Sequence, residues 1–525
     1  MKRLEEMFER GEISRRKFLA ISAALGASAV LPTGLFGSKA LAATPKNGGR
    51  LRIGLQGGST SDSMDPAKFN DVYVQMTSMG FLRNPLVEID YKGNAIPDLA
   101  EGWEPDASAK VWVFNLRKGV EFHNGKSLDA DDVIFSIQRH LDEKLASQIK
   151  SMVQQIITFK KDGPHRVIFE LANPNADFPY ILADTRAAIV PAGTTDFEKC
   201  IGTGGYKIVE YEPGVRTEAT RFANYYKPNR AHFDAVTITI MADVNARTTA
   251  LQTGQVDVIN RPDRKTAHLI DRTPNLKLVN AKGGLLYTFP MLTDTPPFDN
   301  NDLRLALKYS VDRQEMLDTI LRGYGIVGND QPIPPIVKYH ADLPQRTYDP
   351  DKARFHFKKA GMEGETIELH TSDAAFAGAV DGALLWRQHA QKAGIDIKVV
   401  REPADGYWDN VWNKKGFSAC FWFARVTPDW MFTMAYAADA SANDMHWKNE
   451  KFNQLLVEAR GELNEKKRAQ MYGEMQQIVR DEGGVVIPMI ANMLDAVNEK
   501  VQFENPAGNQ EMDGLRAIER WWFKS

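Results

Sequence analysis

Apolar and polar residues alternate in the first quarter of the chain. Within residues 111–126, Trp112, Phe114 and Leu116 share one face, and the turn pairs Lys118-Gly119 and Asn124-Gly125 follow them. Alternation with period two, interrupted by Gly-containing turn pairs, predicts antiparallel hairpin structure. The first part of the chain is therefore expected to contain a small antiparallel sheet.

Two further patterns flank this stretch. Residues 51–55 form a short apolar run that enters a Gly/Ser-rich loop, and residues 72–79 have helical spacing, so we expect a buried strand, a loop and a helix. A second helix is expected after Ser127 or Asp129, with acidic residues in its first turn. The acidic cluster Asp129, Asp131 and Asp132 lacks the alternating ligands and central glycine of a calcium loop, which favours helix capping.

From residue 283 onward, helical and strand patterns alternate repeatedly. Helices are expected over residues 302–322, 378–393 and 405–415, and strands over residues 366–370, 395–400 and 418–423. This order predicts parallel pairing with right-handed crossovers. Ligands of such open sheets bind outside the carboxyl ends of the strands, so the loops after His370 and Phe423 are expected to open on one edge.

Length and composition narrow the class of protein. A chain of 525 residues is too long for one ordinary core, so we expect at least two lobes. The net charge of −3 and the absence of a Lys/Arg stripe argue against nucleic acid as the main partner. Two cysteines, Cys200 and Cys420, make a disulfide scaffold or a thiolate metal site improbable on composition alone.

The N-terminus has the pattern of an export signal. Arg15-Arg16, followed by Lys17-Phe18-Leu19, precedes an uncharged run that ends in Ala40-Leu41-Ala42, a small-x-small cleavage signal. The run is broken by Pro and Gly, whereas a membrane span needs about 20 strongly apolar residues. We expect residues 1–42 to be a cleaved twin-arginine signal peptide. Its removal lowers the net charge from −3 to −6.

Aromatic residues gather near the expected ligand edge. Six of the ten tryptophans fall between Trp386 and Trp447, and core packing is the default explanation for them. Because aromatic walls and a few polar groups are typical of ligand sites, the residues beside the edge are candidates for binding: Tyr407, Trp422 and Trp430. Arg425 either clamps a ligand carboxylate or pairs with Asp429, and both alternatives remain open.

The sequence carries no clear signature of catalysis or of metal binding. The stretch 323–328 matches G-x-G-x-x-G, but a helical pattern precedes it and a proline-rich segment follows, the reverse of a dinucleotide site, so its glycines are expected to serve turns. The histidines include no pair at i, i+3 or i, i+4, and the Gly/Ser loop is not a nucleophile elbow. No enzyme activity, cofactor or metal is predicted.

Several stretches together resemble the family 5 extracellular solute-binding proteins of ABC importers, the dipeptide, oligopeptide and nickel class. They are "NLRKGVEFHNGKSLDADDV", "IGTGGY", "PPFDNNDLRLALKYSVDRQEML", "YDPDKARFHFKKAG" and "QKAGIDIKVV". The resemblance covers nearly the whole chain after residue 42. It implies a two-lobed α/β fold of the periplasmic-binding-protein type II class, with an extra domain inserted in the first lobe.

The resemblance implies a division of the chain. Lobe I comprises residues 43–82, 200–284 and 497–525, the inserted domain comprises residues 83–199, and lobe II comprises residues 285–496. A ligand is enclosed between the lobes by hinge closure. The Gly/Ser loop, with Ser59 and Ser61, would form one jaw, and the loops after His370 and Phe423 would form the other.

The resemblance also implies a difference from peptide receptors. Peptide binders of this family hold the ligand's amino group with an aspartate four residues before the proline of the equivalent loop, where this chain has Ala424. Asp373 is the replacement cation partner if the ligand is an amine. The expected function is a monomeric periplasmic receptor that delivers a peptide, an opine-like compound or another amino-acid derivative to an ABC permease. The alternatives are an exported enzyme and a receptor for a metal-chelate complex.

Overall fold

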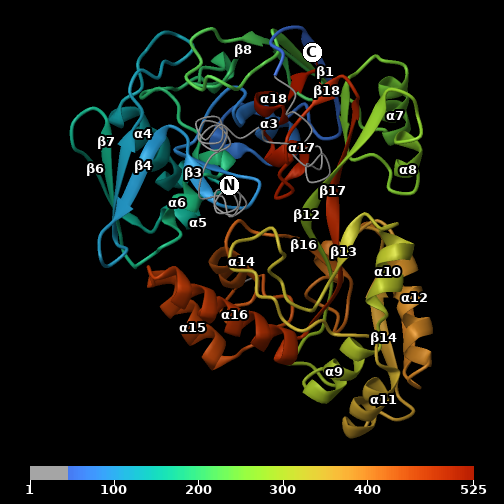
Figure 1. Cartoon of the computed structure of the whole chain (residues 1–525). Coiled ribbons are helices and arrows are strands. Elements are labelled where there is room, and N and C mark those ends of the chain that lie inside the picture. Colours follow the sequence, from blue (N-terminus) through green and yellow to red (C-terminus); the bar gives the residue numbers. More distant parts are fainter. Residues whose placement is uncertain (1–44, 441, 525) are drawn as a thin grey trace, which may run out of the picture. The chain divides into compact units, whose positions relative to one another are not determined.

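The computed structural model describes residues 45–440 and 442–524 (Figure 1), so the signal peptide expected over residues 1–42 lies outside the described part. The largest described sheet has nine strands in the order β16-β12-β17-β11-β1-β10-β9-β8, with β13 paired to β17. β1 pairs in parallel with β10 and β11, and the remaining pairings are antiparallel. The members are β1 (Arg50–Leu55), β8 (Tyr206–Glu212), β9 (Arg216–Arg221), β10 (Ala235–Ile240), β11 (Val258–Asn260), β12 (Leu276–Pro290), β13 (Gly325–Val327), β16 (Cys420–Phe423) and β17 (Val485–Asn498).

A first hydrophobic core surrounds β1. Leu51, Ile53 and Leu55 are fully buried, and the expected strand, loop and helix follow in that order, the helix being α3 (Val72–Ser78). Asp71 begins this helix by accepting hydrogen bonds from the backbone N–H groups of residues 73 and 74. Four further helices and two short strands complete this part: α7 (Val244–Gln252), α8 (Ala267–Ile270), α17 (Glu511–Gly514), α18 (Ala517–Arg520), β18 (Val501–Gln502) and β19 (Trp522–Phe523).

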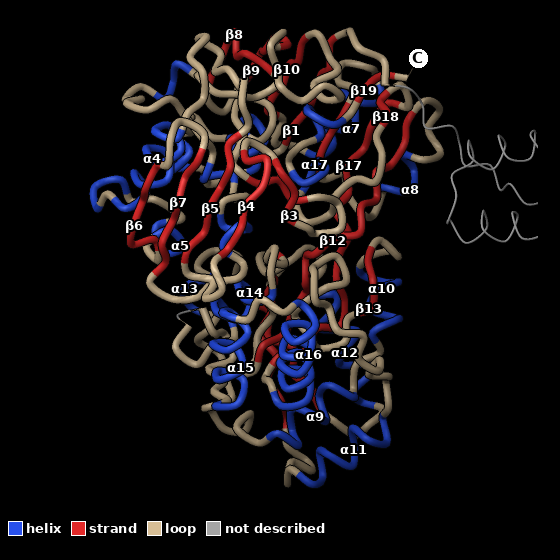
Figure 2. The backbone as a smooth tube through the Cα atoms, turned by 60° about the vertical axis from the view of Figure 1, so that its left-hand side comes forward, coloured by secondary structure: helices blue, strands red, loops and turns tan. Residues whose placement is uncertain are grey.

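The antiparallel sheet expected near residues 111–126 is present (Figure 2). Its strand order is β4-β5-β7-β6, and Trp112, Phe114 and Leu116 of β5 all point into a second core. Helix α4 begins with a capping box between Asp129 and Asp132, which confirms the capping interpretation of the acidic cluster. The elements are β2 (Val87–Ile89), β3 (Ala95–Pro97), β4 (Ala100–Pro105), β5 (Val111–Leu116), α4 (Ala130–Gln138), α5 (Lys150–Val153), β6 (Ile156–Lys161), β7 (Arg166–Leu171) and α6 (Phe178–Ile181).

The second half of the chain forms the expected α/β unit. β14 (Thr366–Thr371) and β15 (Asp396–Arg401) are parallel and are joined by α12 (Ala379–Gln391). A parallel bridge from His370 to Ser418 places the segment before β16 beside β14. The carboxyl ends of these strands therefore lie at one edge, as predicted. Further helices cover this part: α9 (Asn301–Tyr309), α10 (Arg313–Ile320), α11 (Pro350–Lys359), α13 (Tyr407–Asn410), α14 (Pro428–Ala435), α15 (Glu450–Gly461) and α16 (Glu465–Glu482).

Three local predictions were wrong. The helix expected over residues 302–322 is divided into α9 and α10, because the hydroxyl of Ser310 bonds the carbonyl of Leu307 and the carboxylate of Asp312 caps the second helix. The helix expected over residues 405–415 ends early, since Asn413 has a φ of 57°. The stretch 323–328 is not only a turn, because its centre forms β13 against β17.

Strands β12 and β17 connect the hydrophobic cores. They pair antiparallel along almost their whole length, with a register shift between Ala281 and Leu285. One end of the pair packs with residues 250–270 in a core that contains Leu278 and Ala496. The other end contributes Phe289 and Val486 to the core of the α/β unit. The two strands therefore belong structurally to both halves of the described chain.

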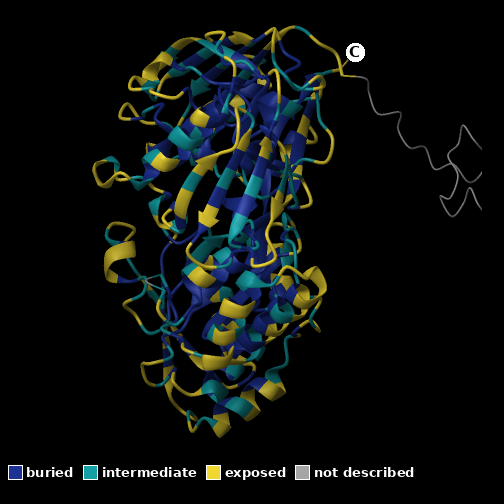
Figure 3. Ribbon diagram, turned by 90° about the vertical axis from the view of Figure 1, so that its left-hand side faces the viewer, coloured by how far each residue is buried: buried dark blue, intermediate teal, exposed yellow. Residues whose placement is uncertain are grey.

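Burial follows this plan. In Figure 3 buried residues fill the interior of both parts, and exposed ones lie on loops, on the outer turns of helices and on the outer strands such as β6. Within residues 45–440 and 442–524, every helix is too short or too polar to cross a membrane.

Candidate functional site

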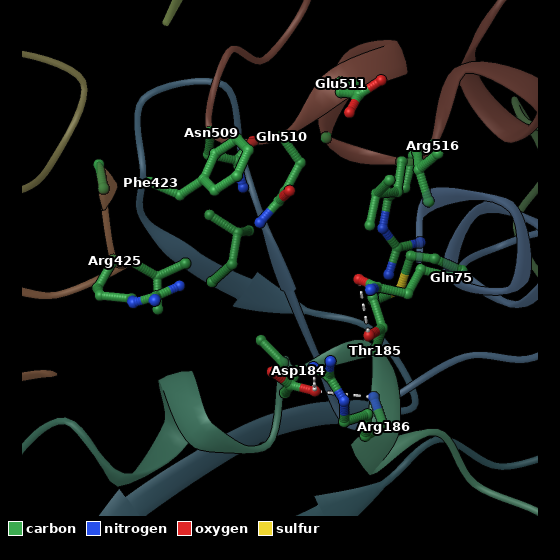
Figure 4. A pocket seen from close by; sticks show the side chains of 18 of the residues that line it. Gln75, Asp184, Thr185, Arg186, Phe423, Arg425, Asn509, Gln510, Glu511 and Arg516 are labelled. Atoms are coloured by element: carbon green, nitrogen blue, oxygen red, sulfur yellow. Dashed lines mark hydrogen bonds and ion pairs between the residues drawn. The ribbon is translucent and has the colours of Figure 1, made fainter. Parts of the chain in front are cut away.

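The loop after β16 opens into a cavity of about 420 Å³, called here the smaller cavity (Figure 4). Its other walls come from the first turns of α3, from residues 183–186 and from residues 509–516. These segments lie far apart in sequence. The volume is within the range of small-molecule sites, roughly 300–1,000 Å³.

Arg425 is the central charged group of this cavity. It follows β16 and lies beside Trp430, whose ring centroid is 6.0 Å from the guanidinium carbon. Thr427 accepts a hydrogen bond from the backbone N–H of Trp430 and begins α14, which fixes the position of the indole. Burial lowers the pKa of Arg425 below its ordinary value; the charge of Asp184 opposes this shift, and the charge of Arg186 adds to it.

Arg425 has no hydrogen-bond or ion-pair partner among the described residues, and its buried Nε lacks an acceptor. The other three arginines of the cavity are paired. Arg186 donates to the carbonyl of Phe69 at 2.9 Å, Arg261 pairs with Glu511, and Arg516 pairs with Asp98 at 2.7 Å. Arg425 is half-buried, and its Nε has neither solvent nor an acceptor, so an anion at this position would supply acceptors that the protein lacks.

The carboxylates of the smaller cavity are already occupied. Asp71 accepts bonds from the backbone of α3 and of Gly58, and Asp184 accepts from the backbone N–H of Arg186 at 2.8 Å. Glu511 accepts from Arg261 and, through Oε2, from Asn260 at 2.9 Å. Ala424 lines the same cavity. The net electrostatic demand of the site is therefore for a negative group.

One wall of the cavity has an unusual backbone. Met512, Asp513, Gly514 and Leu515 all have φ between 50° and 68° in succession. Left-handed geometry costs about 1–2 kcal/mol for each residue with a side chain. The turn is held by hydrogen bonds, including those that Asp513 accepts from the backbone N–H of residue 507 and from the indole of residue 521. It places Glu511 at the cavity, consistent with strain kept at a functional position.

A larger cavity of about 780 Å³ adjoins the smaller one, and Arg261, Phe423 and Glu511 line both. Strand register explains its apolar floor. Leu285 is paired with Phe423, and Tyr287 with Phe421, so all four side chains lie on the same face of the sheet.

The predicted site residues divide into two groups. Arg425 and Trp430 line the smaller cavity, and Asp373 lines the larger one. Ser59 and Ser61 are exposed and bond each other through their hydroxyls at 2.9 Å, outside both cavities. Gly57 is the part of the Gly/Ser loop that lines the smaller cavity.

Three other candidates lie outside the walls of both cavities. Tyr407 is buried in the core, and its hydroxyl donates to the carbonyl of Ala419 at 2.7 Å. Trp422 has the opposite orientation to its neighbours in β16 and donates to the buried Asp444 at 3.0 Å. Asp429 pairs with Arg460 at 3.0 Å, so Arg425 keeps no partner there.

Sequence reasoning missed much of the site. Gln75, Arg186 and Gln510 line the smaller cavity and come from three distant segments (Figure 4). The helix start at Asp71 marked the neighbourhood of Gln75, but nothing local distinguished the other two. Phe421 and Phe423, which were not among the predicted site residues, both contribute to the larger cavity.

Metal chemistry receives no support from geometry. Across the described parts of the chain, no three His, Cys, Asp or Glu side chains come together in a way that could hold a metal ion.

Comparison with known proteins agrees with the fold. A family model described as bacterial extracellular solute-binding proteins, family 5, matches residues 94–444. The chain is 25% identical over 493 residues to di/tripeptide-binding protein 1 of Pseudomonas aeruginosa, covering 87% of this chain and 91% of that protein. It is 27% identical over 442 residues to heme-binding protein A of Haemophilus influenzae, covering 76% and 80%. The solved structure of AgaA from A. tumefaciens R10 with agropinic acid gives a TM-score of 0.72 at 23% identity, covering 91% and 99%.

Proposed function

Because the chain belongs to the bacterial extracellular solute-binding proteins of family 5, we propose that it captures a small anionic solute and presents it to the permease of an ABC importer. The observation that supports the anion is Arg425, a partnerless guanidinium held beside Trp430 in the smaller cavity. An acid group on the solute would supply the acceptors that the protein does not.

The chemistry required is binding alone. The guanidinium of Arg425 donates to a carboxylate, the indole of Trp430 packs against the cation and the solute, and exclusion of water strengthens both contacts. Gln75 and Gln510 offer neutral donors and acceptors around the acid group. Since Asp71, Asp184 and Glu511 already accept hydrogen bonds, a free ammonium group would have to compete with these donors for a carboxylate of this cavity.

This charge layout favours carboxylates without a required amino terminus. N-substituted amino acids and opine-like acids fit it better than ordinary dipeptides. Agropinic acid, the compound in complex with AgaA in the A. tumefaciens structure, is an acid of the general kind that would satisfy Arg425.

The proposed transport cycle depends on closure of two lobes around the solute. We take residues 43–82, 200–284 and 497–525 as lobe I, residues 83–199 as its inserted domain, and residues 285–496 as lobe II. The smaller cavity draws its walls from all three, so closure on a solute would order them together. Export to the periplasm through the twin-arginine signal and a monomeric state complete the proposal.

Calorimetric titration with two opposed probes tests the anion site. N-acetylphenylalanine has a carboxylate and no ammonium group, and phenylalaninamide has the reverse. We expect the first to bind and the second not to bind. Arg425→Gln should weaken binding of the first probe about 10- to 150-fold, the value of a charge-assisted hydrogen bond of about 1.5–3 kcal/mol.

Arg354→Gln is the matched control, because its ion pair with Asp351 is exposed and distant from the cavities. It should bind like the unmodified protein. Preference for phenylalaninamide, or equal affinity in Arg425→Gln, would contradict the proposal. Mass spectrometry of gently purified protein under native conditions adds an independent check, since a retained compound should carry an acid group. Conversion of that compound by trace amounts of protein would instead indicate an enzyme.

A further inference from the structure

The larger cavity has an aromatic floor that the anion site does not use. Tyr287 and Phe376 stack with ring centroids 4.1 Å apart and an interplanar angle of 11°. Phe421 and Phe423 meet edge to face at 5.7 Å. Tyr287 and Phe376 are themselves buried and support the floor from below, so the apolar surface that is open to the cavity comes mainly from the half-buried Leu285, Phe421 and Phe423.

The charged groups of this cavity lie among residues 261–265 and at Arg322, Asp373, Asp381 and Glu511, and the only polar group of the aromatic floor is the hydroxyl of Tyr287. Positive and negative side chains are both present there, so no net charge is demanded of an occupant. Arg264 donates to the carbonyl of Asn492 at 2.7 Å. An occupant therefore gains most by covering the aromatic floor, which is the property of an apolar or aromatic group.

The two cavities meet at a shared boundary. The ion pair between Arg261 and Glu511, together with the ring of Phe423, lines both of them. Only one residue separates Phe423 from Arg425 in sequence, so the aromatic floor begins within roughly 7 Å of the anion site. A single elongated molecule can thus place its acid group at Arg425 and its body over the floor.

We propose that the solute is an elongated carboxylate whose aromatic or apolar body occupies the larger cavity. This inference rests on the proposed function, because Arg425 anchors the acid group. A solute confined to the smaller cavity would leave the half-buried side chains of the floor, Leu285, Phe421 and Phe423, in contact with water. Burying that floor adds favourable free energy in proportion to the apolar area covered, roughly fourfold in affinity for each buried methylene.

Titration with a series of ω-phenyl carboxylates, from phenylacetate to 6-phenylhexanoate, tests the proposal. Affinity should be weak and flat for the shortest members and should then rise about two- to fourfold per methylene, once the ring passes Phe423. Ala377→Trp should abolish the rise, because Ala377 is an exposed residue of the cavity wall and an indole there would fill the space. Ala377→Ser is the matched control and should keep the rise.

The outcomes separate the two proposals. Weakening of every member by Arg425→Gln, with affinity that does not depend on length, would overturn the elongated solute and leave the anion site standing. Indifference of every member to Arg425→Gln would overturn the anion site itself. Thermal unfolding of Ala377→Trp shows whether its core is intact. If this variant unfolds early, the length dependence in the unmodified protein and in Ala377→Ser decides the question.

Discussion

An ion pair between Asp177 and Arg468 provides a sharp test of how the halves of the molecule are held together. The two side chains are 2.7 Å apart, and each is only 6% exposed. The backbone N–H of Ala176 also donates to the carbonyl of Arg460 at 2.8 Å. These contacts join the loop before α6 to α15 and α16. Tyr180 of α6 lines the smaller cavity, so the contact is close to the proposed solute.

Asp177→Asn removes the negative charge and keeps the shape. Arg468 would then be a buried cation without a direct ion-pair partner, whose remaining hydrogen bonds are with neutral groups, including the hydroxyl of Tyr472 at 3.3 Å. Removing one partner of a buried pair costs about 3–5 kcal/mol when the other charge stays buried. If the loop before α6 separates from α15 and α16, water reaches Arg468 and relieves this cost. The substitution therefore favours separation of the two segments.

Hydrogen exchange measured by mass spectrometry follows that separation. Peptides covering residues 174–180 and 459–472 should exchange at least tenfold faster in Asp177→Asn, while peptides of the β14–β15 sheet should not change. Affinity for the carboxylate probe should fall as well, because part of the binding free energy would be used to bring the separated segments together again.

Asp162→Asn is the control, since its ion pair with Arg166, beside the four-stranded sheet, is 55% and 48% exposed at its two side chains. Exposed pairs contribute about 0–1 kcal/mol, so exchange and affinity should match the unmodified protein. Unchanged exchange in both variants would refute the claim that the buried pair holds the two segments together.

Two further substitutions address stability and loop geometry. Burial lowers the pKa of His123 from 6.5 to about 4, so the folded protein resists protonation of this ring. As the pH falls from 6.5 towards 4, the unfolded chain takes up a proton that the folded protein does not, and about 3 kcal/mol of the free energy of unfolding is lost. His123→Gln should remove that loss in urea unfolding at pH 7.5 and 4.5; a constant difference from the unmodified protein would contradict it. Gly508→Ala should weaken carboxylate binding at least tenfold, because its methyl group would lie 1.7 Å from the carbonyl oxygen of Lys282 and displace the loop that ends at the cavity. Gly102→Ala meets no neighbouring atom within 4 Å and should bind normally; equal binding by both glycine variants would show that the loop position is unimportant.

The sequence predicted the elements whose signals are local. The alternation of Trp112, Phe114 and Leu116 and the acidic start of α4 needed only neighbouring residues, and both are present as expected. The division at Ser310 and Asp312 could have been foreseen, because a hydroxyl and a carboxylate favour helix ends over helix interiors. The division was missed because apolar residues keep a helical spacing both before Ser310 and after Asp312.

The site was harder because its parts are distant in sequence. Arg425 and Trp430 were found, since one short loop contains both. Arg186 and Gln510 reach the same cavity from other segments, and only tertiary packing brings them there. The direction of Trp422 could not be decided either, since aromatic residues occupy both faces of β16 and period-two alternation leaves the choice of face open.

Because side chains alternate along β16, substitutions at its three aromatic positions are expected to have two different effects. Phe421 and Phe423 face solute space, whereas Trp422 donates to the buried Asp444 on the opposite side of the same strand. Changes in size at the two outer positions would reshape selectivity and leave the indole contact intact. A change at the central position would disturb the core without altering the floor. Substitutions at Phe421 or Phe423 can therefore change the preferred solute one side chain at a time, while the hydrogen bond from Trp422 to Asp444 keeps the strand in place.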